Sequence, residues 1–232
     1  MKLNPLKKER STDQIESKLI KKIIANEFVE GSTLPSEREL ASQLGVGRPT
    51  VREVLQRLER DRWITCRSGM PATVNNFWKE GNLTTLVNII ENRASVADEF
   101  IQYLLELRVS LAPVYIREAV NANQAKVVAL LADIEELTNS AAGYAAFDWE
   151  LQKSLAGLSP NPVYLLILNS LDSIYLNMAE RYFTVEDYRK MSHGYYIKLL
   201  DVALKGDVQQ AEELVKVTME KSLVLWKNRG KQ

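Results

Sequence analysis

The sequence predicts a mainly α-helical chain of two domains: a small N-terminal domain with one β-hairpin, and a C-terminal bundle made only of helices. Two observations support this division. Apolar residues recur at helical spacing over most of the 232 residues, and strand-like character is confined to a short stretch between Trp63 and Asn75. A polar, glycine-containing segment near residue 80 separates the two patterns. The 46% hydrophobic content is sufficient for a core in each domain.

The first two helices are predicted from periodicity and capping. Apolar residues at helical spacing indicate a helix over residues 12–27, and a Gly-Ser-Thr break follows it. Ser36 begins the second helix with Glu39 three positions later, which is a capping box in which each side chain takes an unpaired backbone N–H. Gly45 then permits a sharp turn.

The third helix and the hairpin complete the N-terminal domain. The helix starts near Gly47, and Pro49 is tolerated because first-turn N–H groups have no helical partner. Its buried stripe has the spacing i, i+3, i+4, i+7 and comprises Val51, Val54, Leu55 and Leu58. Residues 63–66 and 71–75 are predicted to be short strands. Three helices followed by a hairpin make residues 1–76 a winged helix-turn-helix domain.

The remaining chain is predicted to be a linker and an all-helical domain. Residues 77–82 are the expected linker, docked by the aromatic pair Phe77 and Trp78. Residues 83–232 are expected to form a bundle of antiparallel helices. The expected helices cover 83–91, 95–120, 124–140, 146–157, 161–183, 186–205 and 207–228.

Charge and cysteine content restrict the class of protein. The net charge is zero, but residues 1–78 hold 14 Lys and Arg against 10 Asp and Glu, whereas residues 79–232 hold 16 against 20. This asymmetry is typical of a chain in which only one domain meets phosphate. One cysteine, no apolar leader and no membrane-length apolar run lead us to expect a cytoplasmic protein without a membrane partner.

Double-stranded DNA is the partner that the N-terminal domain favours. Arg48 and Arg52 share the face of the third helix opposite its apolar stripe, where an arginine can bind guanine or clamp phosphate. Thr50 is placed for a phosphate or a thymine methyl, and Arg38 on the preceding helix for the backbone. At the hairpin tip, Ser68 offers a donor and Gly69 allows close approach. Taken singly, each arginine could simply be a solvated surface residue; the whole set favours DNA.

The segment LPSERELASQLGVGRPTVREVLQRLERD resembles the GntR family of bacterial regulators. PATVNNFW and NPVYLLILNSLDSIYLNMAERYF resemble its FadR branch, the fatty acid metabolism regulators, from about residue 30 to the C-terminus. The resemblance implies a homodimer on a palindromic operator, released by long-chain acyl-CoA, that represses fatty acid degradation and activates unsaturated fatty acid synthesis. Gly47, Pro49, Ser68 and Met70 depart from the branch, so we expect a related but not identical operator.

The resemblance also implies an acyl-CoA site in the helical domain, at Leu105, Arg108, Tyr175, Tyr182, Ser222 and Trp226. Three neighbours of the last two, Met219, Lys221 and Leu223, depart from the branch, and bulk there could shorten the tunnel. Leu168, Leu171, Tyr175, Met178 and Tyr182 fall on one face of an expected helix, which would also suit an ordinary bundle core. Chain length preference is left open.

Metal-dependent sensing and catalysis are both disfavoured. Related helical domains hold a divalent ion with one Asp and three His, but the only histidine here is His193. Asp148 stands at the aspartate position, and the three histidine positions correspond to Gln152, Ile197 and Thr218, which make a poor transition-metal site. We expect no metal, no cofactor and no catalytic residues, since no nucleophile–base grouping is present. A regulator of a different metabolite, an acyl-CoA-using enzyme and a plain dimerisation domain are the alternatives.

Overall fold

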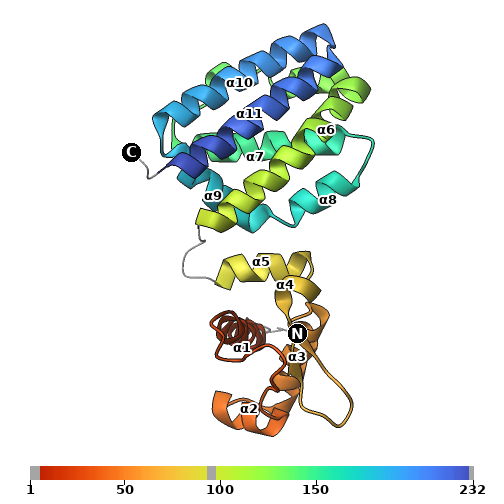
Figure 1. Ribbon diagram of the computed structural model, residues 1–232, viewed down its shortest axis with the longest axis vertical. Helices are drawn as coiled ribbons and strands as arrows, with labels where there is room; N and C mark the ends of the chain where they lie inside the picture. The colour runs from red at the N-terminus through yellow and green to blue at the C-terminus, as the bar shows by residue number, and fades with distance from the viewer. Residues whose placement is uncertain (1–5, 93–97, 230–232) are drawn as a thin grey trace, which may run out of the picture. The chain divides into compact units, whose positions relative to one another are not determined.

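The computed structural model describes residues 6–92 and 98–229 and separates into two compact units, with the division between residues 95 and 96. The mainly helical fold predicted from the sequence is confirmed (Figure 1). Each unit is described by itself. Within the described ranges, no helix has the length and apolar character needed to cross a membrane.

The N-terminal unit is built from five helices and a short hairpin within residues 6–92. Its elements are α1 (Leu6–Ile24), α2 (Glu37–Leu44), α3 (Arg48–Arg60), β1 (Ile64–Thr65), β2 (Thr73–Val74), α4 (Phe77–Glu80) and α5 (Leu83–Asn92). The first helix begins and ends earlier than residues 12–27, and Asn26 just beyond it has φ +60°. Both strands are shorter than predicted.

Local sequence signals determine the helix-turn-helix geometry. The Ser36 hydroxyl accepts from the Glu39 N–H at 3.3 Å, and the Glu39 carboxylate accepts from the Ser36 N–H at 2.8 Å, so the predicted capping box is present. Gly45 ends α2 at φ +67°, a conformation that favours glycine. The four apolar residues of α3 are all buried, as predicted from their spacing.

The wing is a small sheet to which a third segment contributes. Ile64 pairs with Val74 and Thr65 with Thr73 in antiparallel register. A bridge from Thr33 to Thr73 adds the segment before α2 to the same sheet. The Gly31 N–H donates to the Val74 carbonyl, the Val74 N–H donates to the Ser32 carbonyl, and the Leu34 N–H donates to the carbonyl of residue 72, just before β2. This contribution ties the start of α2 to the wing.

The helix over residues 83–92 packs with the N-terminal unit, whereas the sequence placed it in the C-terminal domain. α5 lies against α1, and the Thr85 hydroxyl donates to the Asp61 carbonyl beyond the end of α3. Phe77 anchors the segment that precedes α5, because the Phe77 ring packs on Trp63 with 5.1 Å between the ring centroids. Trp78, also expected to dock, is 59% exposed. The expected linker at 77–82 is therefore folded into this unit, including the short helix α4.

The C-terminal unit contains helices only, within residues 98–229. Its elements are α6 (Asp98–Leu130), the 3-10 turn η1 (Ile134–Glu136), α7 (Ala141–Leu158), α8 (Val163–Asn169), α9 (Asp172–Phe183), α10 (Glu186–Lys205) and α11 (Val208–Asn228). The break expected between helices 95–120 and 124–140 is present as a kink at Asn123 inside α6. The second expected helix ends earlier than predicted, at Leu130 rather than at residue 140. The expected helix 161–183 is two helices, because the chain breaks at Ser170 and Leu171.

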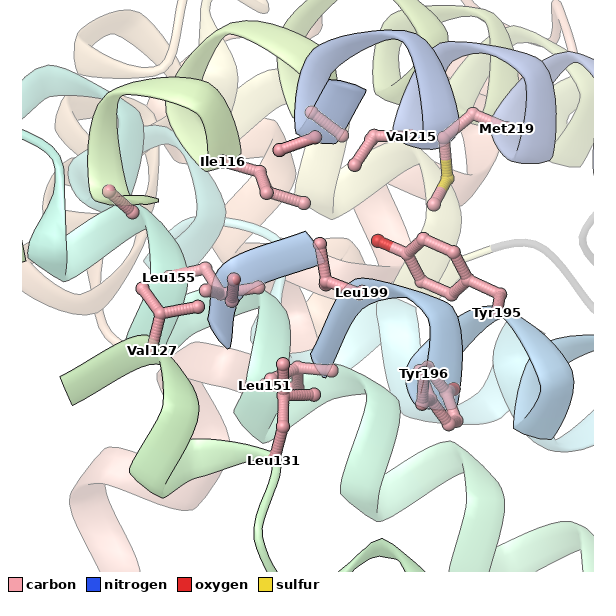
Figure 2. Close-up of a cluster of buried hydrophobic side chains, with 14 of the residues drawn as sticks. Ile116, Val127, Leu131, Leu151, Leu155, Tyr195, Tyr196, Leu199, Val215 and Met219 are labelled. Atoms are coloured by element: carbon pink, nitrogen blue, oxygen red, sulfur yellow. The ribbon is translucent and has the colours of Figure 1, made fainter. Parts of the chain in front are cut away.

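The core of this unit lies between α6, α7, α10 and α11. Figure 2 shows Leu199 and Tyr195 of α10 facing Val215 and Met219 of α11, with the Tyr195 hydroxyl directed toward α11. Leu199 and Val215 are fully buried, and Met219 is 3% exposed. The Met219 side chain therefore occupies interior space next to Tyr195.

Candidate DNA-binding surface and interior cavities

The arginines predicted to meet DNA lie on the exposed side of the helix-turn-helix. The apolar stripe of α3 is buried, and Arg48 and Arg52 of the same helix are exposed to solvent. Arg38 is exposed on α2. Thr50 is half-buried in the first turn of α3, where its N–H bonds to the Gly47 carbonyl at 3.1 Å. This arrangement presents cations next to the N-terminal end of a helix, which is how recognition helices meet base edges and phosphates.

One of these arginines has an acidic partner that sequence reasoning missed. Arg52 donates from Nε to Glu37 Oε1 at 3.1 Å and from Nη2 to Glu37 Oε2 at 2.8 Å. Its guanidinium lowers the pKa of the Glu37 carboxyl through these hydrogen bonds. The two residues are on different helices, and no local spacing rule links them.

The wing tip lies close to the start of α2. The Met70 N–H bonds to the Arg67 carbonyl at 3.0 Å, closing a turn in which Gly69 has φ +75° and Ser68 is exposed. An open groove joins this turn to α2, lined by Pro35, Ser36, Glu37, Leu55 and residues 66–72. The candidate DNA-binding residues thus come from α2, α3 and the wing of one compact unit.

All six residues expected to contact acyl-CoA line one interior cavity of the C-terminal unit, the first chamber. They come from α6, α9 and α11: Leu105, Arg108, Tyr175, Tyr182, Ser222 and Trp226. Met219 also lines this chamber, whereas Leu223 does not. The chain brings these residues together from positions more than a hundred apart in sequence.

A buried ion pair with tyrosine hydroxyls forms the polar wall of the first chamber. Arg108 donates from Nη2 to Asp148 at 3.0 Å and from Nη1 to the Tyr175 hydroxyl. Asp148 also accepts from the hydroxyls of Tyr175 and Tyr196, the latter at 2.9 Å. Burial raises the pKa of both tyrosines well above the ordinary value, so both hydroxyls stay protonated and act as donors. The charge of Arg108 is therefore balanced inside the protein.

A second chamber adjoins the first and is lined almost entirely by apolar side chains. The two share Leu105, Arg108, Tyr175 and Met178 as a common wall. The further apolar lining comprises Leu104, Leu107, Leu111, Trp149, Leu168, Leu171 and Ile174. The apolar stripe from Leu168 to Tyr182 therefore lines both chambers, although it lies on two helices, α8 and α9, rather than on one. Each chamber measures about 50 Å³, far below the several hundred Å³ typical of pockets for drug-sized ligands.

The correspondence drawn from the sequence for a metal site needs one correction. Asp148, Gln152 and Thr218 line the chambers, but Ile197 is 46% exposed and lies outside both. Tyr196, one position earlier, is the residue of α10 whose side chain donates to Asp148. Among the described residues, no group of three or more His, Cys, Asp or Glu side chains is placed to hold a metal ion.

Each of the two parts of the chain matches a known protein family. Residues 11–74 match the family described as bacterial regulatory proteins, gntR family, and residues 75–232 match the FadR C-terminal domain. The family match changes at residue 75, near the expected domain boundary, and the compact units divide about twenty residues later. The helix α5 accounts for this difference, because it packs on α1.

Whole-chain relatives agree with these matches. A fatty acid metabolism regulator protein of Shewanella halifaxensis is 38% identical over 213 residues, covering 92% of this chain and 89% of the relative. A protein of the same description from Pasteurella multocida is 34% identical over 223 residues, covering 96% and 92%. Lar, described as controlling expression of the Listeria monocytogenes agr system, has a solved structure that aligns over 99% of this chain and 100% of its own, with TM-score 0.61 and 15% identity. That likeness concerns the fold alone.

Proposed function

Because the chain belongs to the GntR family of bacterial regulatory proteins and carries a FadR C-terminal domain, we propose that it is a transcriptional regulator of fatty acid metabolism whose DNA binding is relieved by long-chain acyl-CoA. This places it among regulators rather than among enzymes. In the proposed mechanism two copies bind a palindromic operator in the cytoplasm. They repress genes of fatty acid degradation and activate genes of unsaturated fatty acid synthesis.

The observation that carries the effector proposal is the first chamber. It joins an apolar wall, suited to a hydrocarbon chain, to a neutralised ion pair and to the buried Tyr195 hydroxyl, which makes no hydrogen bond within the described residues and can donate to an uncharged carbonyl oxygen. A free carboxylate would bring an uncompensated negative charge into this site, because Asp148 already balances Arg108. A thioester brings no such charge.

The dimer proposal follows from the small number of base pairs that one DNA-binding domain can contact. One helix and one wing contact few base pairs, and each mismatched pair typically changes the binding free energy by about 1–3 kcal/mol. Strong discrimination therefore requires two copies, and a two-fold dimer is matched by a two-fold operator.

A titration with and without DNA tests the proposal. Oleoyl-CoA, oleate and free CoA would be titrated calorimetrically into the purified protein, and a second series would follow release of a labelled operator selected from random duplexes. We expect oleoyl-CoA to bind without being hydrolysed and to release DNA, with oleate much weaker and CoA inactive. Absence of both heat and release with oleoyl-CoA would refute the effector assignment but leave DNA binding intact.

The small chamber volume supports one alternative, a GntR-type regulator of a smaller metabolite. Under that alternative, short acyl-CoAs or other small ligands release DNA while oleoyl-CoA does not. The same titration extended to butyryl-CoA and octanoyl-CoA distinguishes the two functions.

A further inference from the structure

The ion pair between α2 and α3 involves one particular edge of the Arg52 guanidinium. Glu37 accepts from Nε at 3.1 Å and from Nη2 at 2.8 Å, so both carboxylate oxygens meet the side edge of the planar fork. A guanidinium has five N–H donors, and this contact uses two of them. The end-on edge, formed by Nη1 and the second Nη2 hydrogen, has the parallel geometry that suits guanine O6 and N7.

The same pair lies where DNA is expected to arrive. Arg52 and Glu37 side chains retain 63% and 36% exposure, so the contact is not held in place by burial. Arg48 acts on the Glu37 carboxyl electrostatically, and Glu37 also lines the groove that runs to the wing. Glu37 is thus an acidic residue in direct contact with a cation of this surface, where it would repel a nearby phosphate.

We propose that Glu37 is a positioning residue for operator recognition: it fixes the Arg52 guanidinium so that its end-on edge reads a guanine, and it keeps Arg52 from binding phosphate. A free arginine side chain populates many rotamers, and part of that conformational entropy is lost when it orders on a base. Glu37 orders it before DNA binds. Because a carboxylate also repels phosphate, its presence lowers general affinity for DNA and raises discrimination between sequences.

Selection of binding sites from duplexes containing 20 random base pairs tests this directly. The variants are Glu37→Gln and, as a matched control, Glu53→Gln, which removes the same charge from a glutamate paired with Arg57 on α3. We expect the wild-type protein and Glu53→Gln to select the same sequence. Glu37→Gln should lose preference at one G·C pair in each half-site and keep the others.

Affinity measurements on the selected site give the magnitude. Replacing that G·C pair by A·T should weaken wild-type binding 10-fold or more, and Glu37→Gln binding only 2- to 3-fold, because a good bidentate pair supplies most of such discrimination. On unrelated duplex DNA, Glu37→Gln should bind more tightly than wild type at low salt. The slope of log K against log salt should steepen by about 0.9, since Arg52 now contacts a phosphate.

An Arg52→Ala background separates positioning from a structural effect on α2. If Glu37 acts through Arg52, the Glu37→Gln change should leave base preference unaltered in that background. A preference change of equal size with and without Arg52 would overturn the proposal, as would a wild-type selection profile for Glu37→Gln. Failure of the wild-type protein to enrich any sequence would instead overturn the DNA-binding assignment.

Discussion

Replacing Asp148 by asparagine should destabilise the C-terminal unit strongly, because it leaves the Arg108 charge without a partner in the interior. Asp148 is 2% exposed and accepts from Arg108, Tyr175 and Tyr196. Removing one partner of a buried ion pair typically costs about 3–5 kcal/mol. The Arg108 side chain retains 19% exposure, so some solvent reaches it, and we expect the lower end, about 3 kcal/mol.

Hydrogen exchange followed by mass spectrometry at increasing urea measures this unit separately from the N-terminal one. Peptides from α7 and α10 report its opening free energy, whereas peptides from α3 should be unchanged in the variant. The matched control is Asp201→Asn, which breaks an exposed pair with Lys205 on α10 and should cost less than 1 kcal/mol. A loss below 1 kcal/mol for Asp148→Asn, or equal losses in both variants, would refute the balanced-pair argument.

Three further predictions follow from burial and pKa. Met219→Ala should cost about 2–5 kcal/mol because the residue is 3% exposed, yet tighten palmitoyl-CoA binding by enlarging the first chamber, and calorimetry and thermal melts measure both. Weaker palmitoyl-CoA binding would contradict it. Hydrogen bonds from the hydroxyl and the backbone N–H of Ser36 lower the pKa of Glu39 below 4.5, so this glutamate stabilises α2 fully above pH 4.5 and loses that effect as pH falls through its folded pKa. Exchange rates between pH 3 and 6 should show this, and Ser36→Ala should weaken the effect but not remove it, because the backbone hydrogen bond stays. Burial raises the pKa of Tyr182 from 10.0 to about 12, so its contribution is present below pH 10 and lost as pH rises toward 12. Absorbance at 295 nm should rise less at pH 11 for the folded protein than for the urea-unfolded one.

Local patterns in the sequence predicted the parts of the structure that depend on local physics. The Ser36–Glu39 capping box and the Val51–Leu58 stripe of α3 follow from rules that operate within a few residues. The six chamber residues were found through family resemblance, and their meeting from α6, α9 and α11 depends on bundle packing that no local spacing contains.

Features determined by tertiary contacts were not predicted. α5 has an apolar face that would suit either domain. It belongs to the N-terminal unit because it packs on α1 and because the Thr85 hydroxyl donates to the Asp61 carbonyl. The kink at Asn123 coincides with the predicted break, but the contact that ties it to α7 was not predicted: the Asn123 side chain donates to the Leu158 carbonyl at 2.8 Å. Glu37 and Arg52 are fifteen residues apart, and only the turn geometry of the helix-turn-helix brings them together.

Two residues of the wall that the chambers share lie near the start of α6, the first helix of the C-terminal unit. Leu105 and Arg108 lie within the first three turns of this helix, which begins at Asp98, shortly after α5 ends at Asn92. A ligand can shift an equilibrium only through contacts that differ between two states. Because both chambers share Leu105, Arg108, Tyr175 and Met178 as a wall, we expect the proposed acyl ligand to displace that wall only when its chain is longer than one chamber. Short acyl chains that leave the wall in place should therefore bind without releasing DNA, which makes release, rather than binding, the step that depends on chain length.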